Sequence, residues 1–152
     1  MVINMKVYFI FEVKEEVKKL YQGNEKILFS ILKQLYYLDK SELIYGYNLF
    51  SQLTNSINKT FLDKTIYIAL HQEIPYSKRG QIHYINNLYK DEISRLEVKR
   101  SYIRLETEQN FSSFTKHLTA YSENLFACDF TKQDYFFLKE EETIKKELVL
   151  ST

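Results

Sequence analysis

The chain has 152 residues, of which 45% are apolar and 27% charged, with a formal net charge of +1. A domain of this length buries roughly 70% of the surface of its unfolded chain, so the sequence predicts one self-sufficient domain over residues 1–152. The single cysteine excludes an intramolecular disulfide, no apolar run reaches the ~18 residues of a membrane span, and the start lacks a signal-peptide pattern, so we expect a cytoplasmic protein.

The first elements are a strand followed by a short helix. Residues 7–13 form a β-branched and aromatic run that predicts a buried, central strand. From Lys14 the apolar spacing becomes helical, and Gly23 is the expected left-handed stop. If Val13 and Leu20 of this helix face the core, then Val17 and Tyr21 share a row turned toward solvent.

A second helix is expected from the cap Asn24 onward, with an apolar stripe at helical spacing. The stripe consists of Ile27, Leu28, Ile31, Leu32, Leu35 and Leu38. Residues 39–41 predict a turn, and residues 42–53 carry helix and strand signals of equal weight. A helix over residues 56–72, capped by Ser56 and packed through Ile57, Phe61, Ile68 and Ala69, is preferred to a strand there.

A loop around Pro75 and residues 77–80 precedes three strands, at residues 82–85, 93–98 and 102–107. The last two alternate apolar and charged side chains, which predicts one buried and one solvated face. On the solvated face, Arg95 and Glu97 are expected to pair across strands with Glu106 and Arg104.

The last third predicts a helix capped by Asn110 and a closing hairpin. Phe111, Phe114, Leu118 and Tyr121 share one side of that helix. Residues 125–130 and 135–138 read as strands joined by a turn, and residues 139–152 as a charged tail or loosely packed helix. The fold class is therefore α+β, with a mixed or mostly antiparallel sheet of about five or six strands packed with three to four helices.

No residue pattern predicts catalysis or a cofactor. His71, His83 and His117 fall on three different predicted elements, which argues against a metal site. Cys128 lies in an apolar strand, where a thiol is usually an inert core residue. The three glycines form no phosphate-binding loop. A small transferase of unrecognised type is the least economical alternative.

Two surfaces remain as candidates for binding. One is a basic, tyrosine-bearing sheet face of the kind that binds single-stranded nucleic acid, and it would consist of Lys78, Arg79, Arg95, Lys99, Arg100 and Arg104 with Tyr84, Tyr89 and Tyr102. The alternative is a solvated face neutralised by Glu92, Glu97 and Glu106. The other surface is the Val17–Tyr21 row, flanked by Lys14 and Lys18, which resembles a small protein-binding hot spot or simply the edge of the core.

The residues around this helix also resemble a known family, the SirA sporulation inhibitors of replication from endospore-forming bacteria. The similarity lies in the first strand ending at Lys14, in Tyr21-x-Gly23 and, near the C-terminus, in residues 127–130 with Tyr135 and Leu138. It implies a non-enzymatic protein that binds the N-terminal domain of the replication initiator DnaA, without direct contact to nucleic acid or membrane.

The resemblance also implies which residues touch the partner. An apolar and aromatic pair of the family's first helix corresponds to Val17 and Tyr21. After the last strand Leu138 matches the family, and Glu140 stands where the family has an interface proline. Lys14 and Lys18 flank the pair. Protein–protein binding through these six positions is the favoured prediction, and a nucleic-acid-binding regulator is the alternative.

Overall fold

The computed structural model describes residues 5–108 and 112–151, with side chains up to residue 144. It contains seven strands and six α-helices, and every strand pair in the described residues is antiparallel. The strands are β1 (Lys6–Glu12), β2 (Tyr76–Arg79), β3 (Ile82–Asn87), β4 (Glu92–Val98), β5 (Ile103–Thr107), β6 (Leu125–Asp129) and β7 (Asp134–Phe137). The helices are α1 (Glu15–Tyr21), α2 (Glu25–Tyr36), α3 (Leu43–Leu53), α4 (Lys59–Leu70), α5 (Thr115–Tyr121) and α6 (Leu138–Ser151).

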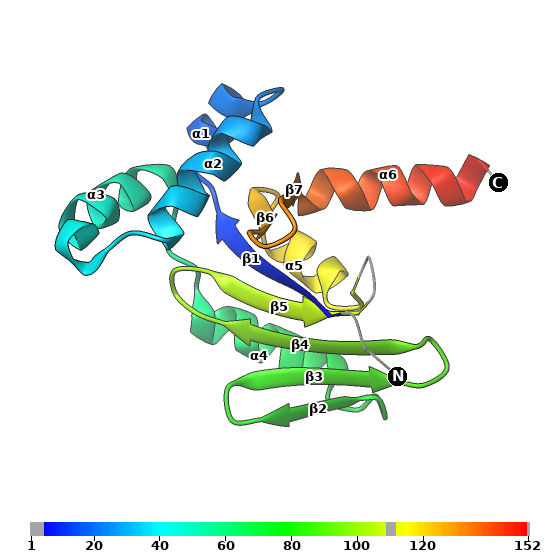
Figure 1. The fold of residues 1–152 in the computed structure, drawn as a ribbon. Coiled ribbons are helices and arrows are strands. Elements are labelled where there is room, and N and C mark those ends of the chain that lie inside the picture. Colours follow the sequence, from blue (N-terminus) through cyan, green and yellow to red (C-terminus); the bar gives the residue numbers. More distant parts are fainter. Residues whose placement is uncertain (1–4, 109–111, 152) are drawn as a thin grey trace.

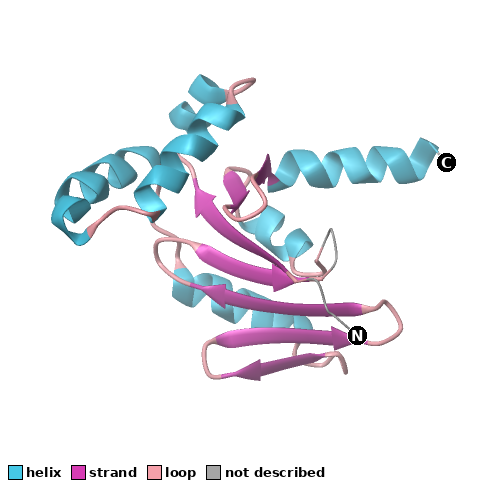
Figure 2. Ribbon diagram, viewed as in Figure 1, coloured by secondary structure: helices cyan, strands magenta, loops and turns pink. Residues whose placement is uncertain are grey.

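The α+β prediction is confirmed, with more strands and helices than expected. All seven strands form one sheet in the order β2-β3-β4-β5-β1-β6-β7, as Figures 1 and 2 show for most of its length. The predicted first strand is β1, and it is interior, between β5 and β6. A buried interior position suits its β-branched and aromatic residues, which pack on both sheet faces.

Helices pack on both faces of the sheet, because successive side chains of a strand point to opposite sides, although α1–α3 cover only the part formed by β1, β6 and β7. Tyr8 and Ile10 join a core with α4 and α5, which lie behind the sheet in Figure 1. Phe11, from the same strand, joins a second core with α1, α2 and the end of α3. The second core is rich in aromatic side chains, with Phe126 and Phe137 only 4.7 Å apart between ring centroids.

The helical layer α1–α3 begins and ends largely as the residue types predict. Gly23 has φ +84°, the left-handed conformation expected of the residue that stops α1. Asn24 is the N-cap position of α2, but its side chain caps nothing; the Glu25 carboxylate instead accepts a hydrogen bond from the Gly23 amide at 3.0 Å. A 3₁₀ turn, Lys40–Glu42, leads into α3, which settles residues 42–53 as helical.

Some predicted details are wrong. The cap of α4 is Asn58, whose side chain accepts from the Phe61 amide, and Ser56 lies outside the helix. The buried face of α4 is Leu62, Ile66 and Leu70, while Phe61 and Ile68 are exposed. The expected loop at residues 77–80 is mostly strand β2, which pairs with β3 through a turn at Gly80. The predicted cap Asn110 and its neighbour Phe111 lie outside the described residues.

The predicted C-terminal hairpin is confirmed, and of the two predictions for the residues after it, a tail or a loosely packed helix, the structure has a helix. β6 and β7 pair from Asp129–Asp134 to Phe126–Phe137. The chain then continues directly into α6, which extends away from the sheet and carries the C-terminus at its far end (Figure 1). Its first turns are anchored, because Leu138 is buried and Glu142, one turn further along, accepts a hydrogen bond from the Thr119 hydroxyl of α5.

Candidate functional site

The short helix α1 presents a different apolar side chain to solvent from the one predicted. Val17 keeps only 7% of its surface exposed and belongs to the aromatic core, whereas Leu20 is 70% exposed. The expectation that Leu20 packs inward and Val17 outward is therefore wrong. Tyr21 is half-buried, with part of its side chain against the core and part accessible. The accessible apolar surface of α1 is thus formed by Leu20 and Tyr21.

Lys18 connects α1 to the C-terminal hairpin and α6. Its Nζ donates a hydrogen bond to the Glu123 carbonyl at 3.0 Å, lies 5.0 Å from the centroid of the Phe137 ring, and lies 4.0 Å from Oε1 of Glu140. The side chain is only 20% exposed, and Glu140 is 50% exposed. The structure therefore brings together two residues, Lys18 and Glu140, that are distant in sequence and were both predicted to lie at the site.

The other two predicted residues lie elsewhere. Leu138 is 3% exposed and packs in the core shared with α4 and α5, across the sheet from Val17. Leu138 was predicted to lie on the binding surface, but its side chain is part of the core and is not accessible to a partner. Lys14 precedes α1 and is half-exposed, at a pocket that it shares with Tyr47 of α3.

A larger apolar surface lies on α3, which the sequence left unassigned. This helix contains no charged residue, and Ile44, Tyr45 and Tyr47 are each more than 70% exposed. A groove of about 390 Å³ runs between α2 and α3, lined mainly by apolar and aromatic side chains such as Leu35 and Phe50. The signal in the sequence is the uncharged stretch over residues 43–58, which contains this helix but does not by itself show that the helix is exposed.

A close approach between α2 and α3 shapes this groove. A Cβ atom at Gly46 would lie 2.2 Å from Cδ1 of Leu38, so a larger residue there would force Leu38 to move. Gly46 is buried in α3 although glycine is a poor helix former. Leu38, in the segment after α2, therefore packs directly against the backbone of α3 at Gly46.

Most cations of the predicted basic sheet face contact acidic or aromatic side chains of β3, β4 and β5. Arg79 and Arg95 both stack on the Tyr84 ring, at 5.5 and 5.6 Å from its centroid. Arg95 also lies 3.9 Å from Glu106, which pairs with Arg104 as well. The predicted register is confirmed, because Arg95 is opposite Glu106 and Glu97 is opposite Arg104. Glu97 and Glu106 thus neutralise this face, but the prediction that Glu92 does so is wrong, because Glu92 is buried and accepts hydrogen bonds from Ser94 and Ser112.

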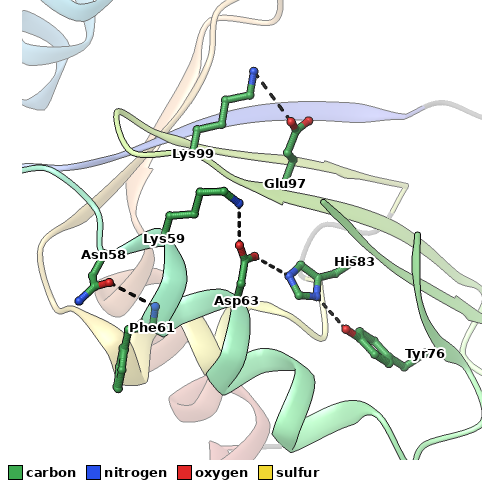
Figure 3. Close-up of polar contacts among 8 residues, drawn as sticks. All are labelled: Asn58, Lys59, Phe61, Asp63, Tyr76, His83, Glu97 and Lys99. Carbon is green, nitrogen blue, oxygen red and sulfur yellow. Dashed lines mark hydrogen bonds and ion pairs between the residues drawn. The ribbon is translucent and has the colours of Figure 1, made fainter. Parts of the chain in front are cut away.

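A buried polar chain connects α4 to β2 and β3 (Figure 3). The His83 ring is fully buried between Tyr76, whose hydroxyl lies 2.8 Å from Nδ1, and Asp63, whose Oδ1 lies 2.8 Å from Nε2. Lys59 pairs with the other Asp63 oxygen at 2.6 Å. A neutral imidazole satisfies both bonds, since Nε2–H donates to the carboxylate and Nδ1 accepts from the hydroxyl.

Burial shifts the pKa values of two members of this polar chain, His83 and Tyr76. Desolvation lowers the pKa of His83 and outweighs the hydrogen bond and charge of Asp63, which raise it. Burial likewise raises the pKa of Tyr76 to about 12. Both ring nitrogens of His83 and both carboxylate oxygens of Asp63 have a partner within the fold, and these bonds hold α4 against the sheet. His71 and His117 lie on other elements, and the described residues contain no cluster of His, Cys, Asp and Glu that could hold a metal.

Comparison with known proteins identifies the family. The family model for the sporulation inhibitor of replication protein SirA matches residues 6–142, from β1 into α6. A search of the curated proteins finds no match. Within the described ranges, no helix is long and apolar enough to cross a membrane. The family match spans the α1 surface, the groove on α3 and the closing hairpin together, and the chain belongs to the SirA family of sporulation inhibitors of replication.

Proposed function

We propose that this protein inhibits the initiation of chromosome replication during sporulation by binding, in the cytoplasm, to the N-terminal domain of the initiator protein DnaA. The observation that carries the proposal is the SirA family match over residues 6–142. The identity of the partner, DnaA, is implied by the resemblance of Tyr21-x-Gly23 and of the closing hairpin to that family. A protein of this kind acts by occupying a surface and needs no catalytic groups.

We place the contact on the exposed side of α1, with Leu20 and Tyr21 as its anchors. Leu20 is the most exposed apolar side chain of this helix, and Tyr21 combines a rigid ring with a hydroxyl that can bond to a partner. Leu20 takes the part that the resemblance assigns to Val17, because Val17 is packed in the core. A few such anchors commonly supply most of the binding energy of an interface.

The fold favours a preorganised contact. Val17 fixes α1 to the aromatic core beneath it, and Lys18 ties the helix to the hairpin through three separate contacts. Binding to a helix already held in place costs less conformational entropy than binding to a mobile segment. Lys14 and Glu140 flank the anchors as polar rim residues, where charges steer association more than they add affinity.

The test is a calorimetric titration of the full chain with the isolated N-terminal domain of DnaA from the same organism. The wild type is compared with Leu20→Ala, Tyr21→Ala and the control Ile68→Ala. Ile68 is 60% exposed on α4, in the helical layer on the other face of the sheet. We expect saturable 1:1 binding that weakens by about thirtyfold in the two α1 variants, since a hot-spot truncation costs about 2 kcal/mol.

The control variant should bind as the wild type does. Circular dichroism and thermal unfolding establish that each variant is folded before its affinity is compared. Equal binding by folded Leu20→Ala and Tyr21→Ala would reject α1 as the contact. A folded wild type that gives neither heat nor co-elution with the DnaA domain would reject that partner.

A further inference from the structure

A second, polar pocket lies beside Lys14, the residue that precedes α1. Its volume of about 270 Å³ is close to about 300 Å³, the lower limit of the usual range for small-molecule sites. Four segments supply its walls: the residue before α1, the second half of α3, residues 54–56, and the turn between β4 and β5. The lining residues are Lys14, Tyr47, Phe50, Ser51, Thr54, Asn55, Ser56, Arg100 and Ser101.

Backbone hydrogen bonds hold these four segments together. The Lys14 amide donates to the Leu53 carbonyl at 3.0 Å, and the Asn55 amide donates to the carbonyl of Glu12 at 2.8 Å. The Ile57 amide donates to the carbonyl of Arg100, also at 2.8 Å. The pocket is therefore built from a preformed backbone framework, not from flexible side chains resting on one another.

The pocket is lined by two cations and by no carboxylate. Within the described ranges, neither Lys14 nor Arg100 forms an ion pair, although both side chains reach solvent. Two positive charges in one concave site, without acidic side chains in its wall, attract an anion and raise its local concentration. An arginine and a lysine together match the charge of about −1.5 to −2 that a phosphate monoester carries at neutral pH.

The same wall offers hydrogen-bond donors that the fold does not use. In the described part of the chain, the side chains of Asn55, Ser56 and Ser101 have no partner. The hydroxyls of Ser51 and Thr54, in contrast, already donate to the carbonyls of Tyr47 and Phe50, each at 2.8 Å. Three unused donors beside two cations suit the several acceptor oxygens of a phosphate group.

We propose that this pocket binds the phosphate group of a small molecule. Lys14 and Arg100 neutralise the phosphate charge, and Asn55, Ser56 and Ser101 donate to its oxygens. The rings of Tyr47 and Phe50 form the apolar side of the pocket and offer a surface for the part of the ligand that carries the phosphate. This site is separate from the Leu20–Tyr21 anchors and does not depend on the identity of the protein partner.

The test is a titration of the full chain with inorganic phosphate and with adenosine monophosphate, followed by protein NMR or calorimetry. Sodium chloride at matched ionic strength separates specific binding from general screening. The variants are Lys14→Gln, Arg100→Gln and the double variant, and the control is Lys64→Gln, which removes an exposed cation from α4. We expect saturable phosphate binding that weakens at least fivefold in each single variant and disappears in the double variant, with Lys64→Gln unchanged.

The two probes distinguish what the pocket recognises. If adenosine monophosphate binds more tightly than inorganic phosphate, and Tyr47→Leu removes this difference, then the rings of Tyr47 and Phe50 contact the base. If the two probes bind equally, the pocket recognises the phosphate alone. Either result supports the proposal. No saturable response to either probe, or a response that the folded double variant retains, would overturn it.

Discussion

Val17 and Leu20 lie one turn apart on α1, yet Val17 is 7% exposed and Leu20 is 70% exposed. The helical period turns Leu20 by about 100° from Tyr21, its neighbour in sequence, so the row of Val17 and Tyr21 meets the core while Leu20 does not. Val17 therefore packs in the core, whereas Leu20 of the same short helix is accessible to solvent or to a partner.

This difference in burial predicts that two similar substitutions destabilise the fold to different extents. Val17→Ala should lower the free energy of unfolding by about 2 kcal/mol, because it leaves a cavity in the aromatic core. Leu20→Ala should change the same quantity by less than about 0.5 kcal/mol, since it truncates an exposed side chain. Urea denaturation followed by circular dichroism measures both. Equal destabilisation by the two variants would contradict the burial described for α1.

Lys18 is expected to stabilise the fold rather than to carry the affinity for a partner. Lys18→Ala removes a hydrogen bond, a ring contact and an ion pair, and should lower the free energy of unfolding by about 1 kcal/mol. The neighbouring Lys19, 75% exposed and paired with Glu15 one turn earlier, supplies the control, and Lys19→Ala should have almost no effect. A larger loss in Lys19→Ala than in Lys18→Ala would refute this assignment.

The buried His83 predicts a pH dependence of stability. Because burial lowers the pKa of His83 in the folded state, the histidine of the unfolded chain becomes protonated first as the pH falls, at a pH of about 6.5. Stability is therefore complete above that pH and is lost as pH falls below it. Denaturation curves between pH 7.5 and 5 should show a shallower decline for His83→Gln than for the wild type. The variant should also be less stable at pH 7.5, because it disturbs the bonds to Asp63 and Tyr76.

The control for this experiment is His71→Gln, since His71 is exposed at the end of α4. It should keep the decline of the wild type. His117 is a second imidazole whose pKa burial lowers, so His83→Gln should reduce the pH dependence without removing it. An unchanged decline in folded His83→Gln would exclude His83 as a source.

Cys128 should be chemically silent in the native protein. It is fully buried in β6, and burial raises the pKa of its thiol well above the ordinary range. Because the thiolate is the reactive form, a colorimetric thiol reagent should label the denatured chain completely and the folded chain negligibly. Rapid labelling of the folded protein at neutral pH would show that β6 opens far more readily than its burial implies.

The sheet face should not bind single-stranded nucleic acid. Arg95 and Arg104 both pair with Glu106, and Arg79 and Arg95 stack on Tyr84, so few of its cations are free to release counterions from a phosphate backbone. Fluorescence anisotropy with a labelled oligonucleotide at low salt should give no saturable signal. Strong binding that falls steeply with added salt and is lost in Arg104→Ala would restore the nucleic-acid alternative.

Much of the fold was predictable because its signals are local. The alternation of Leu96 and Leu105 with charged neighbours predicted both the strands and their register, and the structure confirms that Arg95 lies opposite Glu106. Gly23 ended α1 as expected, since few other residues adopt a left-handed conformation without strain. Residues 42–53 could not be assigned, because an uncharged stretch with Gly46 at its centre satisfies helix and strand patterns equally.

The candidate site was predictable only in part. We predicted it on the first helix and at the start of the last one; Tyr21 and Glu140 are accessible in the structure, whereas Lys18 is only 20% exposed. It did not distinguish Val17 from Leu20, because both lie within the same apolar sector of a seven-residue helix and periodicity cannot say which edge faces the core. Leu138 was misplaced for a related reason, since the step from β7 into α6 turns it toward the opposite sheet face.

The sequence by itself determined the fold class, the first strand and its helix, the register of β4 with β5, and the family. Those features depend on residue types and spacings within a few turns or strands. Only the tertiary structure decided which side of α1 is exposed, that α3 presents an uncharged apolar surface, and that Lys14 and Arg100 share one pocket. These depend on how segments far apart in the chain pack together, and side-chain burial is set by that packing rather than by local pattern.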